Sequence, residues 1–336
     1  MTLDNDRSSV ETGNASPSLS PLAVWALSFG GIIGWGVFIM PGTMFLPNAG
    51  PLGTVIAMFL GGLIMLVIGL NFCHLAKLFP DNGGIFTYTR EILGHDHAFL
   101  SAWSLGLAYL SLIWANATAF SLLVRYLFDG ALQWGFHYQV AGYDVFGGEV
   151  LLALAVLVIF WLLARSRALS RLQTVLGTTL FLSVVLLFAV LLMKNGISSS
   201  ALPAFQPDLP PTMQVFSMLM LAPWMFVGFE AVPHAVTSFR FPAEKLRIIV
   251  MAAVGAGALV YVMLTGIAVL TVPAGYTSWV SYSFARLSPI FSWAAICMRS
   301  PMLFWWRGAS AGSSITGTFS RTTVGIVSEN LLPCAS

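Results

Sequence analysis

The chain has 336 residues, of which 57% are hydrophobic and only 8% are charged. A soluble domain carries about 25% charged residues, so this composition indicates an all-α polytopic membrane protein. The formal net charge of +2 argues against a nucleic acid partner, and membrane lipid is the expected surroundings of the chain. The three cysteines show neither metal-binding nor redox spacing, and no metal or other cofactor is expected.

Residues 1–20 are rich in Ser, Asn and Asp and lack the pattern of a signal peptide, so they are predicted to form a disordered tail. Residues 21–272 contain seven apolar segments that are candidate membrane helices. These predicted spans are Pro21 to Phe45, Leu52 to Phe72, Ala98 to Phe128, Val145 to Leu163, Leu172 to Met193, Met213 to Val236 and Ile248 to Val272. Residues 273–336 are predicted to form an outside loop and a poorly structured tail, because arginines interrupt their apolar pieces.

Lys and Arg residues are concentrated in the connections that follow the second, fourth and sixth spans. The connection after the second span contains Lys77 and Arg90, whereas the connection from Asn48 to Gly53 contains no positive residue. Because positively charged loops stay in the cytoplasm, the sequence predicts a cytoplasmic N-terminus.

The first span contains four glycines within seven positions, at Gly30, Gly31, Gly34 and Gly36. A glycine costs about 1 kcal/mol relative to alanine inside a helix. Irregular backbone at membrane depth is tolerated only where it is buried in protein or lines a cavity. The cluster therefore indicates either a broken helix that forms a binding site or close helix packing through small residues.

The sixth span has the same irregularity, because Pro223 and Pro233 flank Gly228 and Glu230 in an apolar segment. A charged residue near the bilayer midplane is costly, so Glu230 is a candidate for a functional role or for a structural role that fixes a broken backbone. The first and sixth spans stand five apart, as an inverted five-helix repeat requires. This correspondence favours broken helices in both spans.

Three motifs together resemble the amino acid–polyamine–organocation superfamily, specifically its bacterial amino acid permeases. They are the glycine-rich run from Gly30 to Phe38, the segment from Pro80 to Arg90 with its Asn-Gly-Gly turn, and the run from Phe226 to Glu230. The resemblance covers about residues 21–272. It implies an inverted five-plus-five helix fold, of which this chain would supply the first five-helix repeat and two helices of the second, with helices 1 and 6 broken.

The resemblance also implies where an amino acid substrate binds. Its carboxylate would meet the break in the first helix, since helix N-terminal ends favour anions. Its ammonium group would meet backbone carbonyl groups at the break in the sixth helix. The implied contacts are Ile33, Gly34, Trp35 and Gly36 on the first helix, and Phe226, Val227 and the aromatic gate Trp224 on the sixth.

Two departures from the family concern this site. Many relatives have a small hydroxyl residue where this chain has Trp35, and some proton-coupled relatives carry a lysine on the fifth helix, where Leu172 to Met193 has none. Glu230 is therefore the candidate for gating or proton coupling.

Two polar residues of the third span are further candidates to line the cavity. Tyr109 and Asn116 lie seven residues apart, or two helical turns, and share one face. Hydrogen bonds between helices are the alternative role for this pair.

The implied function is secondary transport of amino acids by alternating access across the bacterial cytoplasmic membrane, with a proton or a counter-substrate as candidate second partner. A seven-helix receptor is a further alternative, although the seventh span lacks the lysine of a retinal protein. An enzyme is not expected, because the sequence has no His-Glu-x-x-His pair and no paired intramembrane aspartates.

A fragment without transport activity is the remaining alternative. The family has ten core helices and seven are predicted here, and the recognisable part ends near Tyr282. A truncated gene or a changed reading frame would produce such a change. The expectation is that this chain alone does not catalyse transport.

Overall fold

The computed structural model describes residues 19–34, 36–127, 130–140, 143–163, 167–195, 203–242 and 244–271. Most of the described residues are helical, as predicted for an all-α membrane protein. The helices are α1 (Pro21–Ile32), α2 (Gly36–Met40), the π-helix η1 (Pro41–Phe45), α3 (Leu46–Leu78), α4 (Ile85–Leu93), α5 (His95–Leu127), α6 (Gly147–Leu163), α7 (Arg167–Asn195), α8 (Pro211–Leu219), α9 (Ala222–Met225), the 3-10 helix η2 (Phe229–Ser238) and α10 (Glu244–Thr271). The predicted tails, residues 1–20 and 273–336, lie outside the described residues apart from Leu19 and Ser20.

Three helices of the described part are long and apolar enough to cross a membrane, at Leu46–Leu78, Ser170–Lys194 and Glu244–Leu270. Two shorter apolar helices lie at Pro21–Ile32 and Gly147–Ile159. Each of the seven predicted spans falls on helical structure, but the first and sixth are divided into short pieces.

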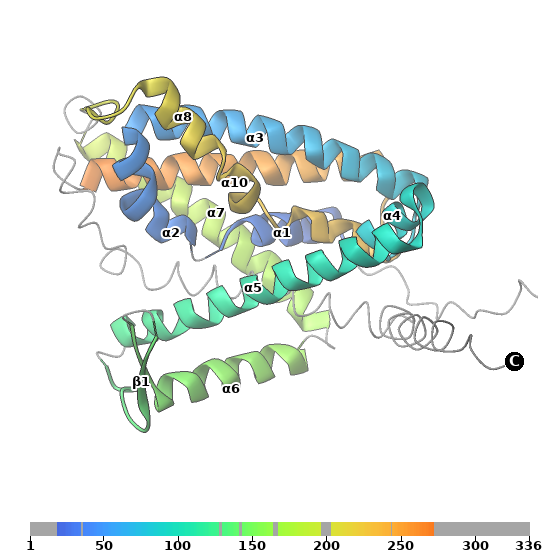
Figure 1. Ribbon diagram of the computed structural model, residues 1–336, viewed down its shortest axis with the longest axis horizontal. Helices are drawn as coiled ribbons and strands as arrows, with labels where there is room; N and C mark the ends of the chain where they lie inside the picture. Colours follow the sequence, from blue (N-terminus) through green and yellow to red (C-terminus); the bar gives the residue numbers. More distant parts are fainter. Residues whose placement is uncertain are drawn as a thin grey trace, which may run out of the picture.

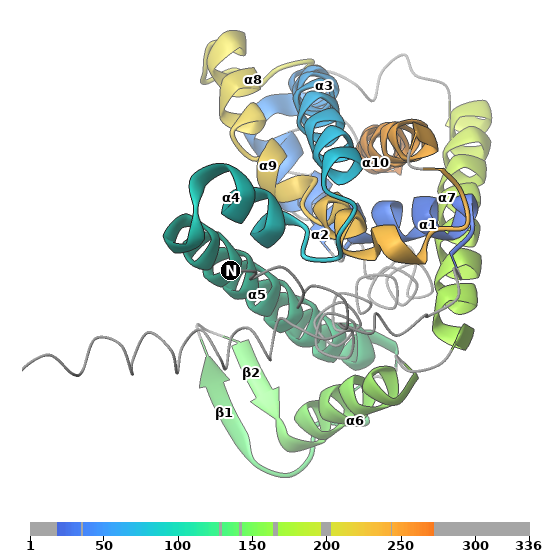
Figure 2. The same cartoon turned by 90° about the vertical axis from the view of Figure 1, so that its right-hand side faces the viewer.

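Helix α10 is the centre of the fold, because it packs against α3, α1 and α7. Figure 1 shows α3 and α10 side by side, and Figure 2 shows α7 on the far side of α10 from α3. The largest fully buried side chains come mainly from the broken helices and include Phe29, Phe38, Phe226 and Phe229. The core of the protein is therefore built around the irregular helices.

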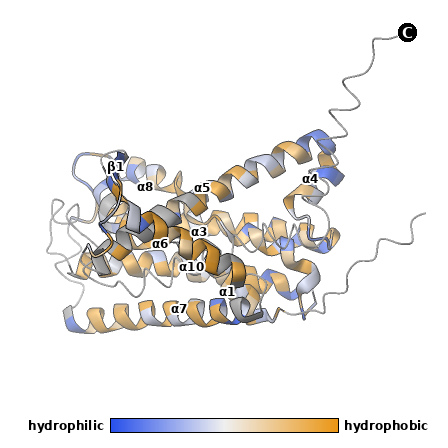
Figure 3. Cartoon of the chain, turned by 90° about the horizontal axis from the view of Figure 1, so that it is seen from below, coloured by the Kyte–Doolittle hydropathy of each residue, from blue (hydrophilic) through white to orange (hydrophobic). Residues whose placement is uncertain are grey.

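Hydrophobic residues cover most of α7 (Figure 3), and its exposed surface is also apolar. Leu182, Leu186 and Val190 recur every four residues along α7 and are more than half exposed. Such a stripe suits contact with lipid tails, which are as apolar as leucine itself.

The predicted connection from Asn48 to Gly53 is a kink within α3 rather than a loop. Gly50 has a φ of 62° and precedes Pro51, which interrupts the helix. The segment before α8 packs into this kink, where the Leu52 N–H donates to the carbonyl of Ala204 at 3.0 Å.

A two-stranded hairpin joins α5 to α6, and the sequence analysis did not predict it. Strands β1 (His137–Val140) and β2 (Tyr143–Phe146) pair antiparallel, with His137 opposite Phe146. Figures 1 and 2 place the hairpin and α6 away from α3 and α10.

Candidate substrate site at the broken helices

The first helix breaks where the glycine cluster predicted it. Helix α1 ends at Ile32, and Ile33 is extended, with φ −84° and ψ 105°. The chain turns helical again at Gly36, where the Val37 N–H donates to the Gly34 carbonyl at 3.2 Å. Ile33 is fully buried, and Trp35 lies outside the described residues. The break therefore includes Ile33 and Gly34.

The sixth helix breaks between Met225 and Phe229. Helix α9 ends at Met225, and η2 begins at Phe229 with 3-10 geometry. Gly228 joins them with a φ of 122°, a conformation that side chains with a Cβ rarely adopt. Pro233 lies inside η2, and the prolines thus flank the break as predicted.

The last turn of α1, just before the first break, touches the second break through the backbone of Gly31 and Gly228. A Cβ added to Gly31 would lie 2.6 Å from the carbonyl oxygen of Gly228, and a Cβ added to Gly228 would lie 2.5 Å from the carbonyl carbon of Gly31. No larger residue fits at either position without displacing backbone. The small-residue packing and the broken helix, which the sequence offered as alternatives, therefore occur together.

Glu230 is buried inside the protein, with 8% of its surface exposed. Its Oε2 atom accepts a hydrogen bond from the Gly228 N–H at 2.6 Å, so the side chain caps the broken backbone. The phenol of Tyr109, from α5, lies close enough to interact electrostatically with the Glu230 carboxyl group. The structure thus brings two of the predicted site residues together.

Asn116 was expected either to line the cavity or to form a hydrogen bond to another helix, but its amide group bonds within its own helix. Its Nδ2 atom donates to the Leu112 carbonyl one turn earlier in α5, at 2.7 Å, rather than to another helix. Its Oδ1 atom is buried and has no hydrogen-bond partner among the described residues.

The three predicted residues of the sixth helix differ in exposure. Phe226 is fully buried and Val227 is partly buried, whereas Trp224 is 51% exposed. The Trp224 ring lies opposite the first break, because its Cη2 atom would be 3.6 Å from a Cβ at Gly36. Trp224 is therefore placed where a gate between the two breaks would stand.

The sequence analysis did not identify Tyr261, which lies in the middle of α10. Its hydroxyl group donates to the carbonyl oxygen of Met225 at 2.9 Å, at the end of α9. Its ring packs against Phe226 and Phe45, with centroid distances of 5.7 Å and 6.0 Å. A buried tyrosine hydroxyl usually finds a hydrogen-bond partner, and this tendency was the only signal of the contact in the sequence.

The Asn-Gly-Gly turn after α3 is attached to the end of η2. The Asn82 Nδ2 donates to Thr237 Oγ1 at 2.6 Å, and the Thr237 N–H donates to Asn82 Oδ1 at 3.2 Å. His234 Nδ1 lies 3.2 Å from the Asn82 carbonyl oxygen. With three residues per 3-10 turn, His234 and Thr237 share the face that meets the turn. We refer to Asn82, His234 and Thr237 as the loop junction.

The start of α1 joins the same region. The Leu19 N–H donates to the Ser238 carbonyl, and the Arg240 N–H donates to the Leu19 carbonyl, both at 3.0 Å. The segments that begin α1 and end η2 are therefore bonded to each other beside the loop junction.

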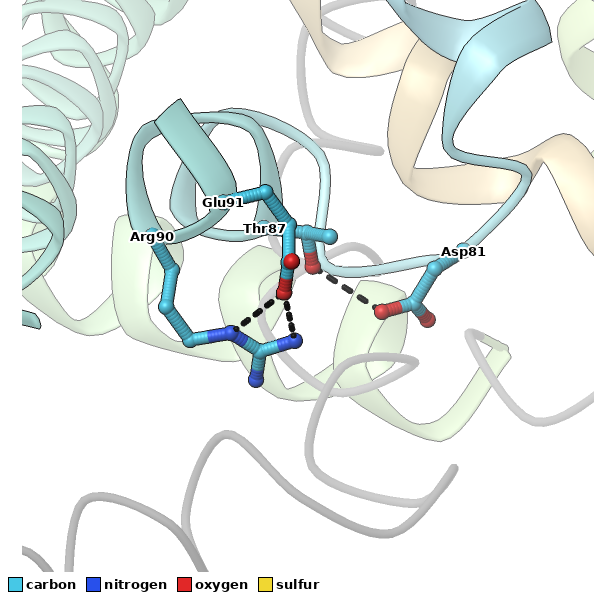
Figure 4. A network of polar contacts seen from close by, with 4 residues as sticks. All are labelled: Asp81, Thr87, Arg90 and Glu91. Carbon is cyan, nitrogen blue, oxygen red and sulfur yellow. Dashed lines mark hydrogen bonds and ion pairs between the residues drawn. The ribbon is translucent and has the colours of Figure 1, made fainter. Parts of the chain in front are cut away.

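Helix α4 continues from this turn with its own polar contacts (Figure 4). Thr87 Oγ1 donates to Asp81 at 2.9 Å, and Arg90 donates to Glu91 through Nε and Nη2 at 3.1 and 2.8 Å. Tyr88 is buried between them, and burial raises its pKa above the ordinary value, with a smaller contribution from the nearby Asp81 charge.

Comparison with known proteins gives a match over most of the chain. A family model described as amino acid permease matches residues 19–328, which extends beyond Tyr282, where the sequence motifs end. The branched-chain amino acid permease BcaP of Bacillus subtilis (strain 168) is 26% identical over 233 residues, which are 66% of this chain and 47% of that protein. The methylthioribose transporter of the same strain is 25% identical over 253 residues, or 73% of this chain and 53% of that protein.

A third relative is named for both its substrate and a coupled proton. The aspartate-proton symporter of Bacillus subtilis (strain 168) is 33% identical over 118 residues, which are 35% of this chain and 22% of that protein. The chain spans about half the length of the first two relatives.

Proposed function

Because this chain belongs to the amino acid permease family, we propose that it binds an amino acid between its two broken helices and serves secondary transport by alternating access. The observation that carries the proposal is the contact between Gly31, at the end of α1 just before the first break, and Gly228 in the second break. The end of α1 thus meets the irregular backbone of the sixth helix inside the protein, and such backbone is tolerated at membrane depth where it is buried or lines a cavity.

The two ends of the substrate are assigned to different helices. The backbone from Ile33 to Gly36 would contact the carboxylate, and the carbonyl groups of Phe226 and Val227 would contact the ammonium group. The position of Trp224 opposite Gly36 supports its role as an aromatic gate. Tyr109 and Asn116 would line the cavity from α5.

Glu230 is assigned the gating or proton-coupling role. Its carboxyl group bonds to the Gly228 N–H and lies beside Tyr109, so protonation would change contacts at the break itself. A change of protonation shifts a conformational equilibrium only if it affects two states differently, and a capping contact at a hinge meets that condition. The aspartate-proton symporter among the relatives supports a proton as the second partner.

The membrane arrangement follows from the distribution of charge. The chain would be a multi-pass protein of a bacterial cytoplasmic membrane with its N-terminus inside. The Lys77–Glu244 ion pair, at 3.5 Å, joins the end of α3 to the start of α10 at the end that also carries the loop junction. Residues 21–272 would form the membrane region, and residues 1–20 and 273–336 would lie outside it.

Equilibrium binding of radiolabelled leucine to the purified chain in detergent tests the site, because one relative is named a branched-chain amino acid permease. Gly36→Leu should weaken binding at least tenfold, since a Cβ there already lies 3.2 Å from Met40 Sδ. Gly255→Leu is the matched control, because a Cβ at Gly255 meets nothing within 4 Å.

Two results would contradict the proposal. Unaltered binding by Gly36→Leu would place the substrate elsewhere. Absence of saturable binding to the unmodified chain, across leucine and the other common amino acids, would remove the functional assignment.

A further inference from the structure

The end of α9 has a carbonyl group that the broken helix cannot satisfy by itself. The last four carbonyl groups of a helix lack partners within that helix. The Phe226 N–H reaches back to the Ala222 carbonyl at 3.1 Å, but the chain then turns away at Gly228. Met225 is buried, with 1% of its surface exposed, so water is not an available partner for its carbonyl group.

Tyr261 supplies the missing donor from another helix. Its hydroxyl group bonds to the Met225 carbonyl at 2.9 Å, and the residue is only 3% exposed. The ring packs against Phe226, which lies in the second break, and against Phe45, at the end of η1. One side chain of α10 thus fixes the direction of the chain as it enters the break.

We propose that Tyr261 is a positioning residue that determines which carbonyl groups of the sixth helix face the ammonium group of the substrate. By occupying the Met225 carbonyl, its hydroxyl group leaves the next two carbonyls, of Phe226 and Val227, as the acceptors at the break. This inference rests on the proposed function, because it specifies how the same site recognises a cation.

The test compares two buried tyrosines in the full chain. Y261F removes the donor and keeps the ring. Y88F is the control, because Tyr88 is equally buried and its hydroxyl group has no hydrogen-bond partner among the described residues. The two probes are leucine and 4-methylpentanoate, which has the same carboxylate and side chain but no ammonium group.

A site with positioned carbonyl groups prefers leucine to the analogue, since those groups are left unpaired when the ammonium group is missing. Y261F should reduce this preference about fivefold to tenfold, the factor that corresponds to one hydrogen bond. Amide hydrogen exchange in residues 222–230 should become faster by a similar factor. Y88F should leave both measurements at the values of the unmodified chain.

The outcomes separate the two proposals. If the unmodified chain binds neither probe and none of the other common amino acids, the proposed function fails, and the role of Tyr261 fails with it. If the unmodified chain prefers leucine and Y261F keeps that preference, only the positioning role is overturned. The same holds if Y261F weakens the binding of both probes by the same factor. If Y261F does not fold, 3-fluorotyrosine at this position, a stronger donor of nearly the same size, should raise the preference, and an unchanged ratio would overturn the inference.

Discussion

Replacement of Gly228 by alanine tests the contact on which the site depends. Alanine at a φ of 122° is strained, and left-handed conformations cost an L-residue roughly 1–2 kcal/mol. The new Cβ would also lie 2.5 Å from backbone atoms of Gly31, which cannot rotate away, and overpacking of this kind costs about 1–3 kcal/mol. The sum is a loss of about 2–5 kcal/mol.

Thermal unfolding of the purified chain in detergent, followed by tryptophan fluorescence, measures this loss. At about 2–4 °C per kcal/mol for a chain of this size, Gly228→Ala should lower the midpoint by about 4–20 °C. Gly255→Ala is the matched control, since it adds the same methyl group to a helix where nothing lies within 4 Å. It should leave the midpoint unchanged or raise it, because alanine favours the helix by about 1 kcal/mol. A midpoint for Gly228→Ala equal to that of the unmodified chain would refute the reasoning.

Two further predictions concern the ends of the sixth helix. Asn82→Ala removes both side-chain hydrogen bonds of the loop junction and should speed amide exchange in the last turn of η2 about tenfold. Asn71→Ala is the control, because it removes only a hydrogen bond within α3 and should leave amide exchange in η2 unchanged. Equal exchange rates in the two variants would contradict the role of the loop junction. Gln214→Ala leaves the buried backbone N–H and carbonyl of Gln206 without their partner and should lower the unfolding free energy by about 2 kcal/mol. Ser217→Ala is its control, because the Ser217 hydroxyl group makes a hydrogen bond only within α8. An equal loss of unfolding free energy in the two variants would contradict the prediction.

Residue types with strong backbone preferences carried the successful predictions. Glycine clusters and prolines bear directly on local conformation, so the breaks after Ile32 and around Gly228 could be located from the sequence. Glu230 could be assigned to the interior because a carboxyl group within an apolar span is costly when it faces lipid. The chemical roles of Ile33, Gly34, Gly36, Phe226 and Val227 remain predictions.

Contacts between distant segments could not be predicted in the same way. A single tyrosine in an apolar span does not reveal its partner, so the bond from Tyr261 to Met225 was not foreseen. The hairpin at 137–146 has strands of only four residues, which carry too little alternation to be recognised. The kink at Gly50 was interpreted as a loop, because a Gly-Pro pair predicts an interruption without giving its length.

The loop junction has a consequence for synthesis of the protein. Asn82 and Thr237 are 155 positions apart in the chain, and Gly31 and Gly228, which pack against each other, are even further apart. At ribosomal speeds of about 5–20 residues per second, Thr237 is made roughly 8–30 s after Asn82. Throughout that interval Gly31, beside the first break, lacks the Gly228 backbone against which it packs in the folded protein. Early insertion and late closure are therefore separate events in the biogenesis of this chain.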